Sequence, residues 1–140
     1  IFREKGDFKT ALEYLSKTFE IDRSKSNLEG IYYSSLKLAD IYCDLKEYQN
    51  ALKFYTIKLD AAKKINSVYY ISSTYLDLGD MYSDMSDFTK AVKFFILAQK
   101  VLGDAISTDS QYRIQRRINN IKRKVGLHSF ENILKDIKNA

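Results

Sequence analysis

The 140-residue chain contains no proline, no tryptophan and a single cysteine, Cys43. One cysteine excludes an intrachain disulfide, and without C-x-x-C spacing it gives no metal or redox signature. No run of 18 apolar residues occurs, and the opening "IFREKGDFK" lacks the apolar region and cleavage site of a signal peptide, so nothing predicts membrane insertion or secretion. We therefore expect a cytoplasmic protein and, because the sequence begins at Ile1, a piece of a longer one.

Motifs that carry chemistry are also absent. Neither G-x-x-x-x-G-K nor G-x-G-x-x-G occurs, so no loop is predicted to hold phosphate. The one histidine, His128, lies near the end of the chain and far from Cys43, and neither has the base or nucleophile partner that catalysis requires. Aspartates four residues apart on a rigid helix lack the loop geometry that surrounds calcium. We predict no enzymatic activity, no metal and no cofactor.

The residues that are present describe helices. Apolar side chains recur at intervals of three and four, as in Leu38, Ile41, Tyr42 and Leu45, which form one stripe along a helix. The pattern predicts an all-α chain, with the five glycines mostly where the helical pattern breaks. The expected helices span about 7–22, 28–45, 48–65, 68–85, 88–102, 109–125 and 128–138.

One phrase occurs three times at a constant spacing. "DFKTALEYL" begins at residue 7, "EYQNALKFY" at residue 47 and "DFTKAVKFF" at residue 87, which places Ala11, Ala51 and Ala91 in register. A helix pair that repeats at a fixed period buries its apolar face only by stacking on its neighbours. The repetition therefore predicts a solenoid of helix pairs.

The repeated residues resemble the tetratricopeptide repeat, whose pattern is W-x2-L-G-x2-Y followed by A-x3-F. The second full repeat reads Tyr75-x2-Leu78-Gly79-x2-Tyr82 and then Ala91-x3-Phe95. The first reads Ser35-x2-Leu38-Ala39-x2-Tyr42 and then Ala51-x3-Tyr55. The period exceeds the roughly 34 residues of the ordinary repeat. In this it is similar to the extended repeats of kinesin light chains, spindle-orientation adaptors and bacterial peptide-sensing regulators.

The resemblance implies a right-handed α-solenoid of antiparallel helix pairs. We expect a leading half repeat at 1–27, full repeats at about 28–67 and 68–107, and a degenerate repeat with capping helices at 108–140. Because the half repeat lacks an upstream neighbour, we expect apolar surface at the N-terminal end, including Phe2, through which the chain can self-associate.

In the tetratricopeptide family the first helix of each pair lines a concave groove in which ligands lie. Helical geometry places acidic and apolar side chains on that side of 28–45 and 68–85. Asp40 with Asp44, and Asp80 with Asp84, are like charges four residues apart, which helix stability alone does not favour. No lysine lies near the second pair before Lys90. The predicted groove residues are Tyr33, Leu36, Lys37, Asp40, Asp44, Ser73, Leu76, Asp77, Asp80 and Asp84.

A basic or amphipathic segment, with Lys or Arg beside apolar anchors, would relieve this repulsion. The alternative is that the aspartates form a solvated face, with Asp84 or Asp87 capping the helix that follows. We predict a protein-interaction scaffold. The second hypothesis is a peptide-sensing module of a larger signalling or transcription-regulating protein.

The excess positive charge lies at the C-terminal end. Residues 1–104 hold 15 Lys or Arg against 15 Asp or Glu, whereas residues 105–140 hold 8 against 3. Ile114, Ile118 and Ile121 share one face of the expected helix 109–125, which favours a structural capping role. The cations Arg113, Arg116, Arg117, Lys122, Arg123 and Lys124 cover the rest, so a secondary basic surface for an acidic partner is the alternative. We do not expect nucleic-acid binding, because Tyr112 is the only aromatic residue available for base stacking.

Overall fold

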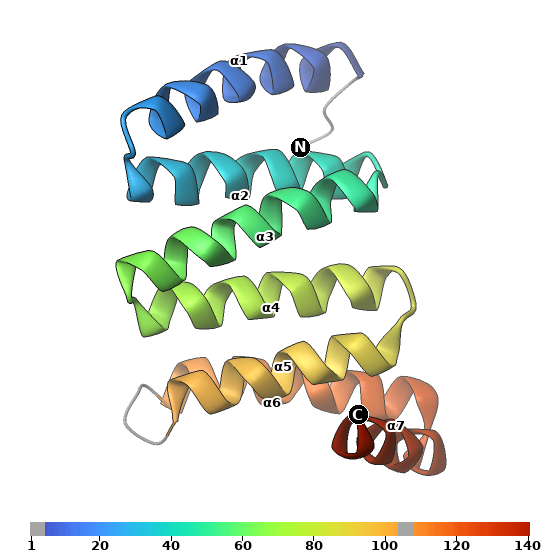
Figure 1. Ribbon diagram of the computed structural model, residues 1–140. Helices are drawn as coiled ribbons and strands as arrows, with labels where there is room; N and C mark the ends of the chain where they lie inside the picture. Colours follow the sequence, from blue (N-terminus) through green and yellow to red (C-terminus); the bar gives the residue numbers. More distant parts are fainter. Residues whose placement is uncertain (1–4, 104–107) are drawn as a thin grey trace. The chain divides into compact units, whose positions relative to one another are not determined.

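The computed structural model describes residues 5–103 and 108–140 (Figure 1). Within these ranges the chain forms seven α-helices and no strand, and helices make up 89% of the described residues. Each helix begins and ends within two residues of its predicted position, which confirms the all-α class. The helices are α1 (Lys5–Ser24), α2 (Leu28–Asp44), α3 (Tyr48–Ile65), α4 (Val68–Asp84), α5 (Phe88–Leu102), α6 (Thr108–Val125) and α7 (Leu127–Asn139).

The helices group into two compact units. The N-terminal unit, Ile1–Ser67, contains α1 to α3, and the C-terminal unit, Val68–Ala140, contains α4 to α7. In the N-terminal unit α2 packs on α3 and α1 packs on α2. In the C-terminal unit α4 packs on α5, and α6 and α7 pack on α5 and on each other. Consecutive helix pairing of this kind is typical of a tetratricopeptide-like solenoid.

The same turn ends four successive helices. Ser26, Lys46, Asn66 and Ser86 have positive φ angles of 53°, 60°, 62° and 61°, a left-handed conformation that commonly stops a helix. In each turn the following N–H donates to a carbonyl five residues back, joining Asn27 to Asp22, Glu47 to Tyr42, Ser67 to Ala62 and Asp87 to Tyr82. These turns recur at equal intervals along the sequence. Each repeat therefore consists of two segments of equal length, and each segment contains one helix and the turn that ends it.

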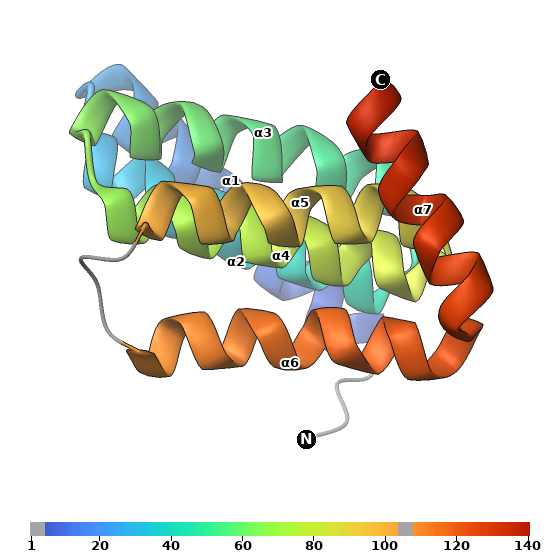
Figure 2. The same cartoon turned by 90° about the horizontal axis from the view of Figure 1, so that it is seen from below.

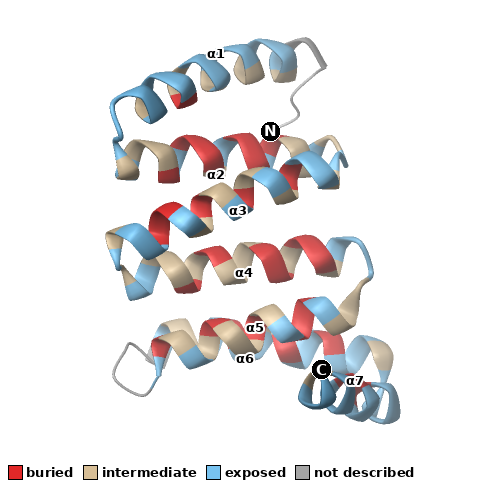
Figure 3. Ribbon diagram, viewed as in Figure 1, coloured by how far each residue is buried: buried red, intermediate tan, exposed pale blue. Residues whose placement is uncertain are grey.

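Small residues bring the two helices of each pair close together. In the N-terminal unit Ala39 and Ala51 are completely buried, and Tyr55 is 4% exposed beside them. In the C-terminal unit a Cβ atom on Gly79 would overlap the ring of Phe95, so only glycine fits there without movement of that ring. Figure 3 shows buried residues recurring along α2, α3, α4 and α5, whereas α1 is mostly exposed or half-buried.

A stacked aromatic pair also recurs in both units. Tyr42 stacks on Phe54 with ring centroids 5.8 Å apart, and Tyr82 stacks on Phe94 at 5.6 Å. Each contact joins the first helix of a pair to the second, and the two contacts occupy matching positions of successive repeats. The aromatic residues therefore stabilise each helix pair from within.

The C-terminal helices complete the core of their own unit. Figure 2 shows α6 running alongside α5 and α7 crossing near the start of α5. Ile114, Ile118 and Ile121 of α6 are buried, as are Phe130 and Ile133 of α7. The predicted apolar face of the basic helix is thus the face that packs.

Candidate partner-binding site

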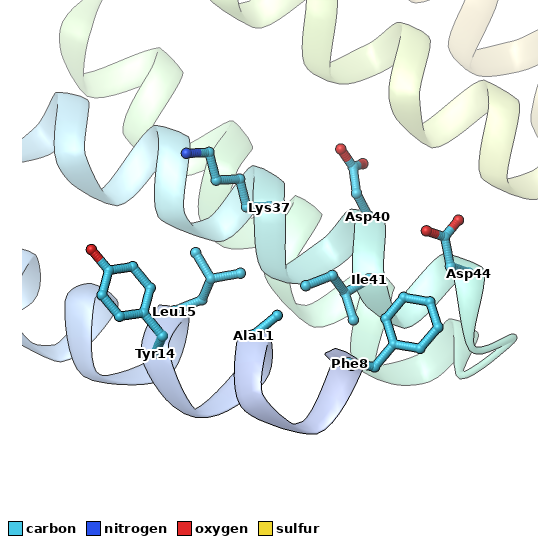
Figure 4. A pocket seen from close by; sticks show the side chains of 8 residues that line it. All are labelled: Phe8, Ala11, Tyr14, Leu15, Lys37, Asp40, Ile41 and Asp44. Atoms are coloured by element: carbon cyan, nitrogen blue, oxygen red, sulfur yellow. The ribbon is translucent and has the colours of Figure 1, made fainter. Parts of the chain in front are cut away.

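An open cleft of about 700 Å³ lies between α1 and α2 of the N-terminal unit (Figure 4). Its floor is largely apolar, and Ile41 points from α2 toward the side chains of α1. The charged side chains of α2 stand at its rim. The lining residues are Phe8, Ala11, Tyr14 and Leu15 from α1, and Lys37, Asp40, Ile41 and Asp44 from α2.

The α2 wall contains three of the predicted groove residues. Lys37, Asp40 and Asp44 are exposed and line the cleft, while Tyr33, 47% exposed, and the half-buried Leu36 lie on the same helix outside it. The buried residues Ser35 and Leu38 occupy the opposite side of α2, as the helical pattern predicted. The cleft therefore combines an acidic rim with an apolar floor.

The carboxylate of Asp40 is held by a side chain from the next helix. The hydroxyl of Tyr55 donates a hydrogen bond to Oδ1 of Asp40 at 2.8 Å, and Sγ of Cys43 lies 3.7 Å from the same hydroxyl oxygen and donates to it. The hydroxyl of Tyr55 is a neutral donor that fixes the orientation of the carboxylate. Cys43 therefore takes part in a packing network.

Sequence reasoning missed the α1 wall. Phe8, Ala11 and Leu15 are half-buried and Tyr14 is 70% exposed, and all four line the cleft. The repeat register contained the signal, because Ala11 and Leu15 align with residues of α3 that are covered by a preceding helix. Phe2, which we expected at this end, lies outside the described residues.

In the C-terminal unit three of the five predicted residues lie beside α6. Ser73 and Leu76 line a small cleft of about 120 Å³ together with Arg113 and Ile114. Asp80 lines a separate hollow of about 270 Å³ with Arg117 and Lys124. The other two predicted residues of this unit are Asp77, which is half-buried, and Asp84, which is exposed. Thus three of the five predicted positions lie in two separate hollows, and Asp77 and Asp84 line neither of them.

Asp80 is paired with a cation from α6. Nε of Arg117 donates to Oδ1 of Asp80 at 2.8 Å. Burial raises the pKa of Asp80 above its usual value, Arg117 opposes that rise, and the nearby charges of Asp77 and Asp84 add to it. The sequence near Asp80 contains no cation to pair with it. Its partner Arg117 lies 37 residues further along the chain, in α6.

Most cations of α6 are engaged by the protein itself. Besides the pair with Asp80, they form a salt bridge, a hydrogen bond and two contacts with aromatic rings, although these cations are exposed, as is Arg116. The capping role and the secondary basic surface therefore both stay predictions. The contacts are Arg113 with Asp109 at 3.3 Å, Arg123 with Asn120, Lys122 over Phe130 at 6.0 Å and Lys124 over Phe88 at 5.4 Å.

Two negative findings concern the described residues alone. In that part of the chain no three His, Cys, Asp or Glu side chains are grouped so as to hold a metal ion. No helix there has the length and apolar character needed to cross a membrane.

Asp87 caps α5, since its side chain accepts from the backbone N–H of Lys90 at 3.2 Å.

Comparison with known families matches the two helix pairs. Residues 34–68 and residues 72–101 each match a family model described as tetratricopeptide repeat. No curated protein and no solved structure matches the chain. Tetratricopeptide repeats generally mediate protein–protein interaction, and the family is typically a non-catalytic scaffold. With the repeat pattern, the helix pairs and both matches in agreement, the chain belongs to the tetratricopeptide repeat family.

Proposed function

We propose that the N-terminal unit binds a segment of a partner protein that carries Lys or Arg residues and apolar anchors, and that this segment lies in the cleft between α1 and α2. The observation that carries the proposal is the composition of that cleft, whose acidic rim and apolar floor meet in one open space of about 700 Å³. Peptide-binding sites commonly combine apolar pockets with a few charges that fix orientation.

The acidic rim supplies charge selectivity. Asp40 and Asp44 are one helical turn apart, and their repulsion is relieved when a cation binds near both. The hydrogen bond from Tyr55 fixes the carboxylate of Asp40 before a partner arrives. A group that is already ordered loses less conformational entropy on binding.

The apolar wall supplies contact area. Tyr14 is 70% exposed, and Phe8 and Leu15 are only half-buried. Exposed tyrosines are enriched at protein interfaces because they offer a large rigid surface with a polar end. An apolar side chain placed between Tyr14 and Leu15 would bury surface on both partners.

The acidic residues of the C-terminal unit are less suited to this role. Asp80 is already paired with Arg117, and this cation offsets its charge, so its carboxylate is a weaker attraction for an added cation. We therefore place the partner in the N-terminal unit.

The test is selection of a displayed random-peptide library on the whole chain. We expect the selected peptides to be enriched in Lys and Arg with apolar residues between them, and to bind more weakly as salt concentration rises, because exposed charge pairs are screened. Selected peptides without an excess of basic residues would contradict the proposal.

Two variants with the same change of charge locate the site. Asp44→Lys reverses one charge at the rim, and Asp60→Lys reverses an exposed charge on α3 that pairs with Lys64. We expect Asp44→Lys to weaken binding of a selected peptide at least tenfold and Asp60→Lys to leave it within about twofold. Equal loss in both variants would show that only the net charge of the chain matters.

A further inference from the structure

The small cleft of the C-terminal unit has a composition that the function proposed above does not use. It lies between α4 and α6, and Leu102 of α5 forms part of its wall, so we call it the α4–α6 cleft. Its volume is about 120 Å³. A pocket that encloses a whole small molecule has roughly 300–1,000 Å³, so the α4–α6 cleft suits a single side chain.

The interior of the α4–α6 cleft is largely apolar. Leu102 is 4% exposed and Ile114 is 2% exposed, and the half-buried Leu76 lines the same cleft. Tyr69 adds a ring that is 66% exposed. An apolar side chain that enters the cleft leaves water on several sides at once, which favours binding. The cleft is therefore suited to an apolar anchor residue of a partner.

Arg113 gives the cleft a positive edge. Among the described residues that line it, Arg113 is the only charged one. Asp80 of α4 lines a different hollow and pairs with Arg117, so it does not offset the charge of Arg113 in this cleft. Hydroxyl groups beside the cation can donate further hydrogen bonds to an anion. They belong to Ser72, Ser73 and Ser110.

Arg113 can bind a carboxylate of a partner as well as one of its own chain. Its Nη2 lies 3.3 Å from a carboxylate oxygen of Asp109, one turn earlier on α6, and both side chains are 69% exposed. An exposed pair of this kind contributes little to stability. A guanidinium has five N–H donors in a planar fork, so it can hold a second carboxylate beside the first. In the repeat register position 113 corresponds to Ser73 and Tyr33, so the cation is particular to α6.

We propose that the α4–α6 cleft binds a segment of a partner protein in which an apolar residue adjoins a Glu or Asp residue. The apolar side chain occupies the space between Leu76 and Ile114, and the carboxylate pairs with Arg113. Both features are needed, because a lone anion leaves the apolar interior unused and a lone apolar residue gains nothing from the cation. This is a second site, in the other unit, with a charge preference opposite to that of the cleft between α1 and α2.

The probe for the test is acetyl-Leu-Glu-amide, a dipeptide whose only charge is the side-chain carboxylate. Two comparison dipeptides each lack one feature, since acetyl-Leu-Gln-amide has no charge and acetyl-Ala-Glu-amide has no large anchor. Titration of the whole isotope-labelled chain, followed by the NMR shifts of backbone amides, gives both the affinity and the location. We expect shifts at Ser73, Leu76 and Arg113. Both comparison dipeptides should bind at least threefold more weakly.

Two pairs of variants locate the site. Arg113→Gln removes the cation of the cleft, and Arg116→Gln removes an exposed cation of the same helix that does not line the cleft. Tyr69→Ala removes a wall, and Tyr112→Ala removes a ring outside the cleft that is also 66% exposed. We expect the first variant of each pair to weaken binding of the Leu-Glu dipeptide at least threefold and the second to leave it nearly unchanged. In the Arg113→Gln chain the Leu-Glu and Leu-Gln dipeptides should bind equally.

Three results would overturn the proposal. The first is equal binding of the Leu-Glu and Leu-Gln dipeptides to the unchanged chain. The second is an equal loss in Arg113→Gln and Arg116→Gln, which would mean that only the net charge of α6 matters. The third is the absence of shifts in the C-terminal unit at millimolar dipeptide. Because Asp44→Lys should leave binding of the Leu-Glu dipeptide within about twofold, failure of this site and failure of the N-terminal cleft are measured separately.

Discussion

The two helix pairs share one register but hold their aligned acidic residue in different ways. Tyr55 in the N-terminal unit donates to Asp40, whereas the aligned Phe95 in the C-terminal unit has no hydroxyl and Asp80 is held by Arg117. A neutral donor orients a carboxylate and leaves its charge, while a cation offsets it. The same acidic position is thus held by a neutral donor in one unit and by a cation in the other.

The largest effect is expected where the second helix is fully covered. Phe95→Ala should lower the free energy of unfolding by about 3–5 kcal/mol, since it removes a buried ring, while Leu15→Ala should cost roughly 1 kcal/mol because Leu15 is half-buried. Chemical denaturation of the two variants and the unchanged chain measures both values. Equal losses would mean that the face of α1 is as well covered in solution as that of α5.

A smaller effect is expected from removal of the hydroxyl. Tyr55→Phe deletes the hydrogen bond to Asp40 and should lower the free energy of unfolding by roughly 1.5–3 kcal/mol, the usual range for a bond to a charged group. It makes position 55 identical to position 95. Denaturation measures the stability, and a selected basic peptide measures binding, which we expect to weaken as Asp40 loses its fixed orientation. Unchanged binding would show that the hydroxyl serves stability alone.

The smallest effect is expected at Asp80 and depends on pH. Burial raises the pKa of the Asp80 carboxyl in the folded chain, so the folded chain binds the carboxyl proton more tightly than the unfolded chain does. The contribution of Asp80 to stability is therefore largest below the usual carboxyl pKa. It falls as the pH rises from there through the raised pKa of the folded chain. Asp80→Asn should remove this fall. At neutral pH it should change the free energy of unfolding by less than about 1 kcal/mol, since the Arg117 contact is partly exposed.

Stability measured from pH 3 to pH 7 tests this prediction. The unchanged chain and the Asp80→Asn variant should diverge over the acidic part of the range, and Asp60→Asn, at an exposed i,i+4 pair, serves as the matched control. A variant that loses stability sharply at neutral pH would show that attraction to Arg117 outweighs the cost of burial.

The fold could be predicted because its signals are local and repeated. The spacing of apolar residues located each helix, and the repeat register paired them before any contact was known. The exposed side of α2, with Lys37, Asp40 and Asp44, followed from helical geometry alone. These features depend on residues within one or two helical turns of each other.

The features that were not predicted depend on contacts between helices. Arg117 and Asp80 are 37 residues apart, and nothing in either segment indicates the other as its partner. The α1 wall was missed because only first helices were considered as partner-binding, although Ala11 and Leu15 carried the register of covered positions. The bond from Tyr55 to Asp40 required knowledge of which side chains meet across the pair.

The recurring half repeat also acts as a measure of length. Helices α2 and α4 have 17 residues each and therefore span about 26 Å at the usual rise per residue. A partner segment that lies in the proposed cleft along α2 would make contact over that distance and no further, which corresponds to about five turns of α2. The spacing of the turns would thus limit how much of a partner contacts the proposed cleft, and residues beyond that limit would extend into solvent.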